Sequence, residues 1–137
     1  ATTENLARCE EFTVAFATKE TMVASDFVGI VSAKNDPEKM LKTGWTATKA
    51  EHVNAPVFTD FPMTMECRIV RKIDETEEGY NLVAEIVNIL VDEAYLGEDG
   101  KPDVEKMQLI TYDPVHHGYI GLGERVGRAF ADGKVLK

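Results

Sequence analysis

The sequence predicts a mainly β fold in which short helices separate the strands. About five segments either alternate apolar and polar residues or are rich in β-branched and aromatic residues, as strands are. The long crossover helices that join parallel strands are mostly missing, so the connections favour antiparallel pairing. A chain of 137 residues suits one domain, and we expect residues 1–137 to form a small open barrel or sandwich.

The first third of the chain predicts one strand and two helices. Residues 11–17 alternate and predict a strand. Residues 19–32 place apolar side chains at helical spacing, which predicts an amphipathic helix or helical turn. A second helix is expected within 36–44, with Asp36 as its N-cap and Gly44 just past its end.

The middle of the chain predicts a long β-hairpin. Residues 45–49 predict a brief strand, and 56–62, bracketed by prolines, an irregular crossing. Residues 63–73 have the two-residue period of a half-buried strand. Its expected apolar face consists of Met63, Met65, Cys67 and Ile69, and its polar face of Thr64, Glu66 and Arg68. Residues 80–91 are apolar on both faces, which predicts a more central strand; an acidic loop at 74–79 joins the two.

The last third predicts a turn, a strand and a short helix. The turn covers 97–103, and at most one helical turn follows it. Residues 118–123 predict the last strand and 124–133 a C-terminal helix. Five strands are few for a closed barrel, and an exposed sheet edge is a liability. We therefore expect either a second subunit or strands outside this sequence to cover that edge.

Composition and charge exclude several classes of function. The formal net charge of −9 repels phosphate backbones, so we expect no nucleic acid partner. The sequence has no apolar run long enough to span a bilayer and no secretory signal, so we expect a cytoplasmic protein without a membrane partner. In that compartment Cys9 and Cys67 are expected to be reduced, mostly buried thiols.

Motifs for common catalytic and metal sites do not fit. The stretch at 121–127 resembles a dinucleotide-binding loop, but Val126 stands where the third glycine belongs. Those glycines instead predict close packing at a strand-to-helix turn. His116 and His117 are adjacent, and on a strand they would point to opposite faces, so we predict no metal site. We name no catalytic acid, base or nucleophile.

The polar residues at the start of the chain have two interpretations. Thr2, Thr3 and Asn5 stand at the front of a short predicted helix. The unpaired N–H groups of a helix N-terminus, together with hydroxyl and amide donors, suit a phosphate group. Alternatively, Thr2 or Thr3 is only an N-cap.

Stretches spread over most of the chain match one known family in order and spacing. They are Thr-Thr-Glu-Asn at 2–5 and the segments 12–18, 24–32, 55–67, 84–96, 99–103 and 118–130. On these segments the chain resembles the flavin reductase-like, FMN-binding split-barrel family, in its flavoredoxin-type branch.

The resemblance implies a fold, a cofactor and a site. The fold is a split β-barrel with Greek-key connections, usually a homodimer with FMN at or near the dimer interface. The phosphate of FMN would be held by Thr2, Thr3 and Asn5. A second segment near the cofactor would be the turn formed by Asp26, Phe27, Val28 and Gly29.

The resemblance also has a gap. In the family, about three strands precede the position of Thr2, and they carry a Trp-containing stretch that packs against the flavin ring. This sequence matches only the C-terminal two thirds or so of the family's domain, so we expect a split-barrel domain lacking those strands.

The implied activity is that of an FMN-dependent oxidoreductase. NADH or NADPH would pass hydride to FMN, which would reduce a small-molecule or protein electron acceptor. Two alternatives stay open: an electron-carrier flavoprotein that needs a protein partner, and a cofactor-free β-domain that serves as a structural or interaction module.

Overall fold

The computed structural model of the protein describes residues 2–76 and 79–137. Its main sheet has three antiparallel strands in the order β1-β4-β5, with β1 at Glu11–Ala15, β4 at Met63–Thr76 and β5 at Gly79–Val91. The strands predicted at 11–17, 63–73 and 80–91 are confirmed. Of the loop expected at 74–79, residues 74–76 belong to β4 and residue 79 to β5, and residues 77–78 lie outside the described part of the chain.

The predicted central position of residues 80–91 is wrong. Strand β4 lies in the middle of the sheet, and β5 pairs only with β4 among the described residues. The apolar residues on both faces of β5 misled the prediction, because several of them stay exposed. They are Val83, Ile86 and Ile89.

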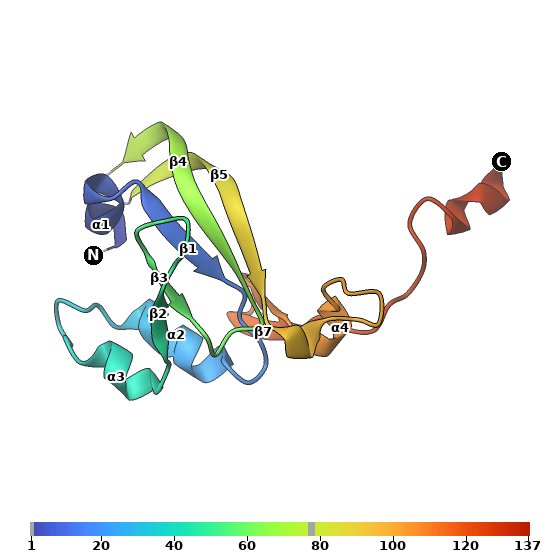
Figure 1. Cartoon of the computed structure of the whole chain (residues 1–137), viewed down its shortest axis with the longest axis horizontal. Helices are drawn as coiled ribbons and strands as arrows, with labels where there is room; N and C mark the ends of the chain where they lie inside the picture. Colours follow the sequence, from blue (N-terminus) through green and yellow to red (C-terminus); the bar gives the residue numbers. More distant parts are fainter. Residues whose placement is uncertain (1, 77–78) are drawn as a thin grey trace.

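Two short antiparallel hairpins accompany the sheet (Figure 1). Strand β2, Ala47–Lys49, pairs with β3, Pro56–Phe58, and β6, Ile110–Asp113, pairs with β7, Gly118–Gly121. Every pairing between named strands is antiparallel, as predicted. The irregular crossing expected at 56–62 is thus partly a strand, which Pro56 can begin because a first strand residue needs no ladder N–H. Strand β6 was not predicted.

The helices are short. They are α1 at Thr2–Arg8, α2 at Met22–Ile30, α3 at Lys39–Thr43 and α4 at Val104–Met107, with 3₁₀ turns at Glu93–Tyr95 and Asp132–Leu136. Gly44 ends α3 in the left-handed conformation, φ 72°, as expected. Asp36 is not the N-cap; it accepts the Glu38 N–H at 3.2 Å in the preceding turn.

The C-terminal helix predicted at 124–133 is wrong. The chain has no regular structure from 122 to 128, and only the 3₁₀ turn follows. The glycine-rich sequence has low helix propensity, and a short helix needs tertiary packing that this exposed segment does not have. Consequently the glycines at 121–127 do not stand at a strand-to-helix turn.

The predicted faces of β4 are only partly confirmed. Cys67, on the expected apolar face, is buried at 3% exposure, but Thr64 and Glu66, assigned to the polar face, are also buried, at 2% and 0%. The loop at 50–55, between β2 and β3, folds over this face. The core cluster there consists of Ala50, Val53 and Val57, packed against Ala55, Val87 and Leu90.

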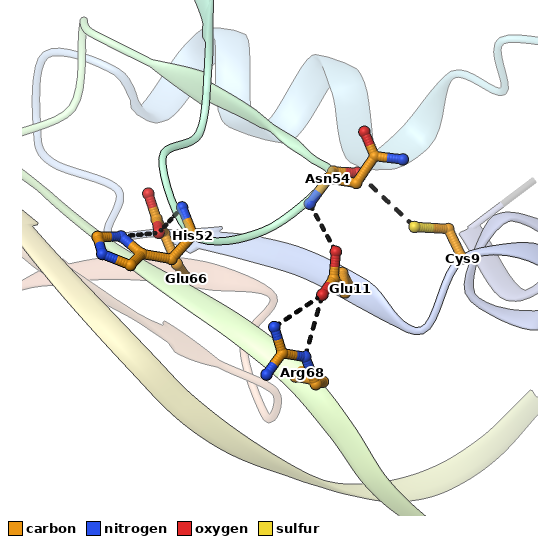
Figure 2. Close-up of polar contacts among 6 residues, drawn as sticks. All are labelled: Cys9, Glu11, His52, Asn54, Glu66 and Arg68. Carbon is orange, nitrogen blue, oxygen red and sulfur yellow. Dashed lines mark hydrogen bonds and ion pairs between the residues drawn. The ribbon is translucent and has the colours of Figure 1, made fainter.

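The buried Glu66 carboxylate holds that loop in place (Figure 2). It accepts the backbone N–H of Glu51 at 3.1 Å and of His52 at 3.0 Å, and it lies 3.1 Å from Nδ1 of the His52 ring. Burial raises the pKa of Glu66, but the two N–H donors and the His52 ring outweigh burial and hold the pKa below its ordinary value. The charged carboxylate is therefore the form that fits the fold.

Replacing this carboxylate should destabilise the protein. Glu66→Gln puts an NH₂ group where the loop presents N–H donors, so at least one buried donor loses its acceptor. We expect the free energy of unfolding, from urea denaturation at pH 7, to fall by about 1–3 kcal/mol. Glu51→Gln is the matched control, because Glu51 contributes only its backbone N–H to the anchor.

Comparing wild type with Glu66→Gln also tests how the free energy of unfolding depends on pH. A pKa that is lower in the folded than in the unfolded protein stabilises the fold above the ordinary glutamate value of about 4.3. This stability is lost as the pH falls through the folded pKa. The difference between wild type and Glu66→Gln should therefore shrink only below about pH 4.3. A difference that grows as the pH falls would contradict an anchor made by the ionised group.

Candidate functional site

An open pocket lies beside the first strand. It has a volume of about 710 Å³ and is lined by residues of α1, β1, α2, α3 and the β2–β3 hairpin. Pockets of roughly 300–1,000 Å³ with an apolar lining and a few polar groups are typical of cofactor sites. This pocket is therefore the candidate functional site.

One part of the pocket wall carries donors and a cation. Thr2 and Asn5 line it from the start of α1, where the first backbone N–H groups of a helix have no intrahelical partner. Lys39 lines it from α3, and its Nζ donates to the carbonyl oxygens of Val28 and Val31 at 2.9 and 2.8 Å. These carbonyls belong to the end of α2, which favours a positive charge.

Another part of the wall is aromatic. Trp45, Phe12 and Phe58 line the pocket. The Trp45 ring centroid lies 5.6 Å from that of Phe58 and 4.8 Å from that of Phe61, the second pair at an interplanar angle of 69°. Edge-to-face packing of this kind holds the indole in one orientation. The wall therefore offers a fixed apolar surface to a planar ligand.

A second carboxylate fixes the 54–56 segment against the sheet (Figure 2). Glu11 on β1 accepts the Asn54 N–H at 2.7 Å through Oε2, and its Oε1 lies 3.0 Å from both Nε and Nη2 of Arg68. The Asn54 N–H and then Arg68 hold the pKa of Glu11 below its ordinary value. Thr13 on the same strand donates to the Pro56 carbonyl at 2.6 Å. These contacts position Asn54 and Pro56 in the pocket wall.

The structure brings three of the seven predicted site residues to this pocket. They are Thr2, Asn5 and Val28. Thr3, Asp26, Phe27 and Gly29 are not among its lining residues. The segment expected as a turn at 26–29 lies within helix α2.

Asp26 and Gly29 have other surroundings in α2. Asp26 accepts a hydrogen bond from the Tyr119 hydroxyl at 2.7 Å, which joins α2 to β7 and raises the pKa of Tyr119. A Cβ added at Gly29 would meet no atom of the chain within 4 Å, so packing within the protein does not require a glycine there.

Sequence reasoning did not predict the other residues of the pocket. Those with polar or aromatic roles described above include Glu11, Lys39, Trp45 and Asn54. Trp45 is the single tryptophan of the chain, which is a signal that deserved weight. The other three have no local signal, because their roles depend on partners distant in sequence, such as Arg68 for Glu11.

The two adjacent histidines, expected on a strand, lie instead in the turn between β6 and β7. The His116 ring nitrogen Nδ1 lies 2.7 Å from Oδ2 of Asp113, and Nδ1 of His117 lies 2.8 Å from the Tyr112 hydroxyl. Within residues 2–76 and 79–137, no group of three His, Cys, Asp or Glu side chains is placed to hold a metal ion.

No helix in the described part of the chain has the length and hydropathy needed to cross a bilayer.

Comparison with known proteins identifies the family. The model of the flavin reductase like domain family matches residues 1–113. Among solved structures, the flavoredoxin of Desulfovibrio vulgaris (Miyazaki F) is 30% identical with a TM-score of 0.88, over 96% of this chain and 69% of that one. The flavoredoxin from Methanosarcina acetivorans is 28% identical with a TM-score of 0.86, over 98% and 69% of the two chains.

A more distant structure shares the fold. The FMN-binding domain of a flavin reductases-like enzyme from Shewanella baltica OS155 is 15% identical with a TM-score of 0.74, over 91% of this chain and 66% of that one. A search of curated proteins found no significant match. The chain belongs to the flavin reductase like domain family, and its mainly β fold is the split barrel of that family, as the resemblance implied.

The two cysteines should differ sharply in reactivity. Cys67 is 3% exposed, and burial raises the pKa of its thiol. Cys9 is half-buried in the pocket wall, with its Sγ 3.7 Å from the Asn54 carbonyl oxygen. Because the thiolate is the reactive form, a maleimide should modify Cys9 in the native protein and Cys67 only on unfolding. Mass spectrometry of the Cys9→Ser and Cys67→Ser variants measures each rate, and fast labelling of Cys67 would contradict its buried position.

Proposed function

We propose that the pocket binds FMN and that the protein is an FMN-dependent oxidoreductase. The observation that carries the proposal is the combination of hydroxyl and amide donors, one cation and an aromatic wall around a single pocket. FMN joins a phosphate to a planar aromatic ring system, so the two kinds of wall match the two ends of the molecule. Family membership supports a flavin-related redox role.

The start of α1 is the proposed phosphate site. Thr2 and Asn5 would donate from their side chains, and Thr3, from its place in the same first turn, would donate through its hydroxyl or backbone N–H. Lys39 adds a positive charge to the same pocket. Its Nζ donates to two neutral carbonyls, so its charge is available to a phosphate. This local charge offsets the net charge of −9, which would otherwise repel an anionic ligand.

The aromatic wall and α2 are the proposed surroundings of the ring. Trp45 and Phe58 would exclude water from one side of a flat ligand. From α2, Val28 would contact the ligand, and the neighbouring Asp26, Phe27 and Gly29 would shape this wall through the position of the helix. When bound, FMN supplies the redox chemistry by accepting hydride and passing electrons on. The protein's own residues bind, orient and shield, and none is assigned as an acid or base.

The donor, the acceptor and the assembly belong to the same proposal. NADH or NADPH would be the electron donor, and the acceptor would be a small molecule or a protein. The protein would act as a homodimer in the cytoplasm. The chain spans 69% of the two flavoredoxin chains it matches, so the activity of the whole protein is part of what the experiments must establish.

Removing one donor should weaken FMN binding selectively. Asn5→Ala deletes an amide that lines the pocket beside the proposed phosphate site. A lost hydrogen bond to a charged group should reduce FMN affinity by about 1.5–3 kcal/mol. Riboflavin lacks the phosphate, so its affinity should not change. Fluorescence titration with both flavins measures the two dissociation constants.

Asn35→Ala is the control for this titration, because Asn35 is exposed and does not line the pocket. An Asn5→Ala protein with unchanged FMN affinity would remove α1 from the phosphate site. A wild-type protein that binds neither flavin would contradict the FMN proposal and support the cofactor-free module.

Nicotinamide oxidation separates a reductase from a carrier. Mixed anaerobically with NADH or NADPH, the FMN-loaded protein should lose its visible flavin absorption, because hydride reduces the flavin. Stopped-flow absorbance measures the rate, and the wild type and Asn5→Ala, each saturated with FMN, should react at equal rates per bound flavin. A flavin that dithionite reduces but neither nicotinamide reduces would contradict the reductase and favour the electron carrier.

A further inference from the structure

A smaller pocket adjoins the candidate site. It has a volume of about 270 Å³ and shares Thr13, Val28, Trp45 and Phe58 with the lining of that site. We call it the side pocket. Ser25 of α2 also lines it. Because Trp45 and Phe58 line both cavities, a flat ligand held against these rings is placed to reach the side pocket with one edge.

The hydroxyl group of Ser25 is the unusual group of the side pocket. Its Oγ is buried, yet it has no hydrogen-bond partner within residues 2–76 and 79–137. A serine inside a helix can donate to the carbonyl oxygen four residues earlier, but the Thr21 carbonyl oxygen accepts only the Ser25 N–H, at 2.9 Å. Leaving a buried hydroxyl without a partner is destabilising, so such a group needs an explanation.

Other hydroxyl groups around the side pocket have partners. Thr13, which lines it, donates to the Pro56 carbonyl oxygen at 2.6 Å. Thr21, one helical turn before Ser25, accepts the Thr18 N–H at 2.9 Å, and its Oγ1 lies 3.3 Å from that of Thr18. Ser25 therefore differs from its neighbours, and it differs where a cavity is open to a ligand.

FMN carries the acceptor that this hydroxyl lacks. One end of its ring system has carbonyl oxygens, and the opposite end has methyl groups. A hydroxyl group beside an aromatic wall distinguishes the two ends, because only the carbonyl oxygens can accept its proton. Thr2 and Asn5, the proposed phosphate donors, line the candidate site and not the side pocket, so the Ser25 hydroxyl is left for the ring.

We propose that Ser25 donates a hydrogen bond to a carbonyl oxygen of the flavin ring and thereby sets which edge of the ring enters the side pocket. The inference rests on the proposed FMN site, and it adds a residue that recognises the ring to those that recognise the phosphate. A donor at this edge also tunes the flavin, because hydrogen bonds to the ring favour its electron-rich, reduced form.

Flavin titration of the Ser25→Ala variant tests the contact. The dissociation constants of FMN and riboflavin should both rise about two- to tenfold, the effect of losing one neutral hydrogen bond. The two factors should be equal, because both flavins carry the same ring. Ser32→Ala is the matched control, since Ser32 is the other serine of the chain, lines neither pocket, and accepts the Lys34 N–H at 3.3 Å.

Two further measurements separate a ligand contact from a structural one. Without flavin, Ser25→Ala should unfold at the same urea concentration as wild type or at a higher one, because it removes an unpaired polar group and alanine favours a helix. With FMN bound, the midpoint potential from dye equilibration should be more negative than that of wild type, because the reduced ring has lost a donor.

The outcomes distinguish this inference from the proposed function. If Ser25→Ala leaves both affinities or the midpoint potential unchanged, the ring contact is overturned while FMN binding stands. A loss of FMN affinity without a loss of riboflavin affinity would place the hydroxyl at the phosphate and overturn it too. Lower stability without flavin would reveal a structural partner, with the same consequence. A wild type that binds neither flavin would instead refute the proposed function, and the Ser25 contact with it.

Discussion

The buried carboxylate of Glu66 is the contact on which the candidate site depends. A charge with no exposed surface is costly unless donors surround it, and Glu66 is 0% exposed. Its donors come from residues 51 and 52, so burying the charge requires the loop to lie on β4. A second carboxylate on the neighbouring strand β1 has the same role, because Glu11 accepts the backbone N–H of Asn54. Two adjacent strands thereby position the 54–56 wall of the pocket.

The pocket combines segments that are far apart in the sequence and different in character. The start of α1 supplies donors, α3 supplies Lys39, the link from α3 to β2 supplies Trp45, and β3 supplies Phe58. Lys39 also holds the end of α2 through two carbonyls, so one side chain both fixes a helix and brings a positive charge to the pocket. In an acidic protein, a local cation favours an anionic group at this pocket, which suits a phosphate-bearing cofactor.

Local pattern predicted what depends on neighbours in sequence. Two-residue alternation identified β1 and β4, and Gly44 marked a helix end through its left-handed conformation. Alternation does not say which face another segment will cover, so Glu66 was expected on an open face of β4 and is instead buried. The residues of the candidate site also divide into those that local sequence predicts and those that depend on distant segments. Asn5 was predicted from local donor chemistry and the family resemblance, whereas Lys39 depends on the placement of α3 beside α2, which no short motif encodes.

The central claim, that a flavin occupies this pocket, is tested most directly through Trp45. It is the only tryptophan in the chain and lies in the pocket wall, so its fluorescence reports this place alone. Titration with FMN, corrected for absorbance, should quench the emission along a saturable curve with one flavin per chain, because a flavin in contact with an indole accepts its excitation. Saturable FMN binding that leaves the Trp45 emission unchanged would place the flavin elsewhere and contradict the account.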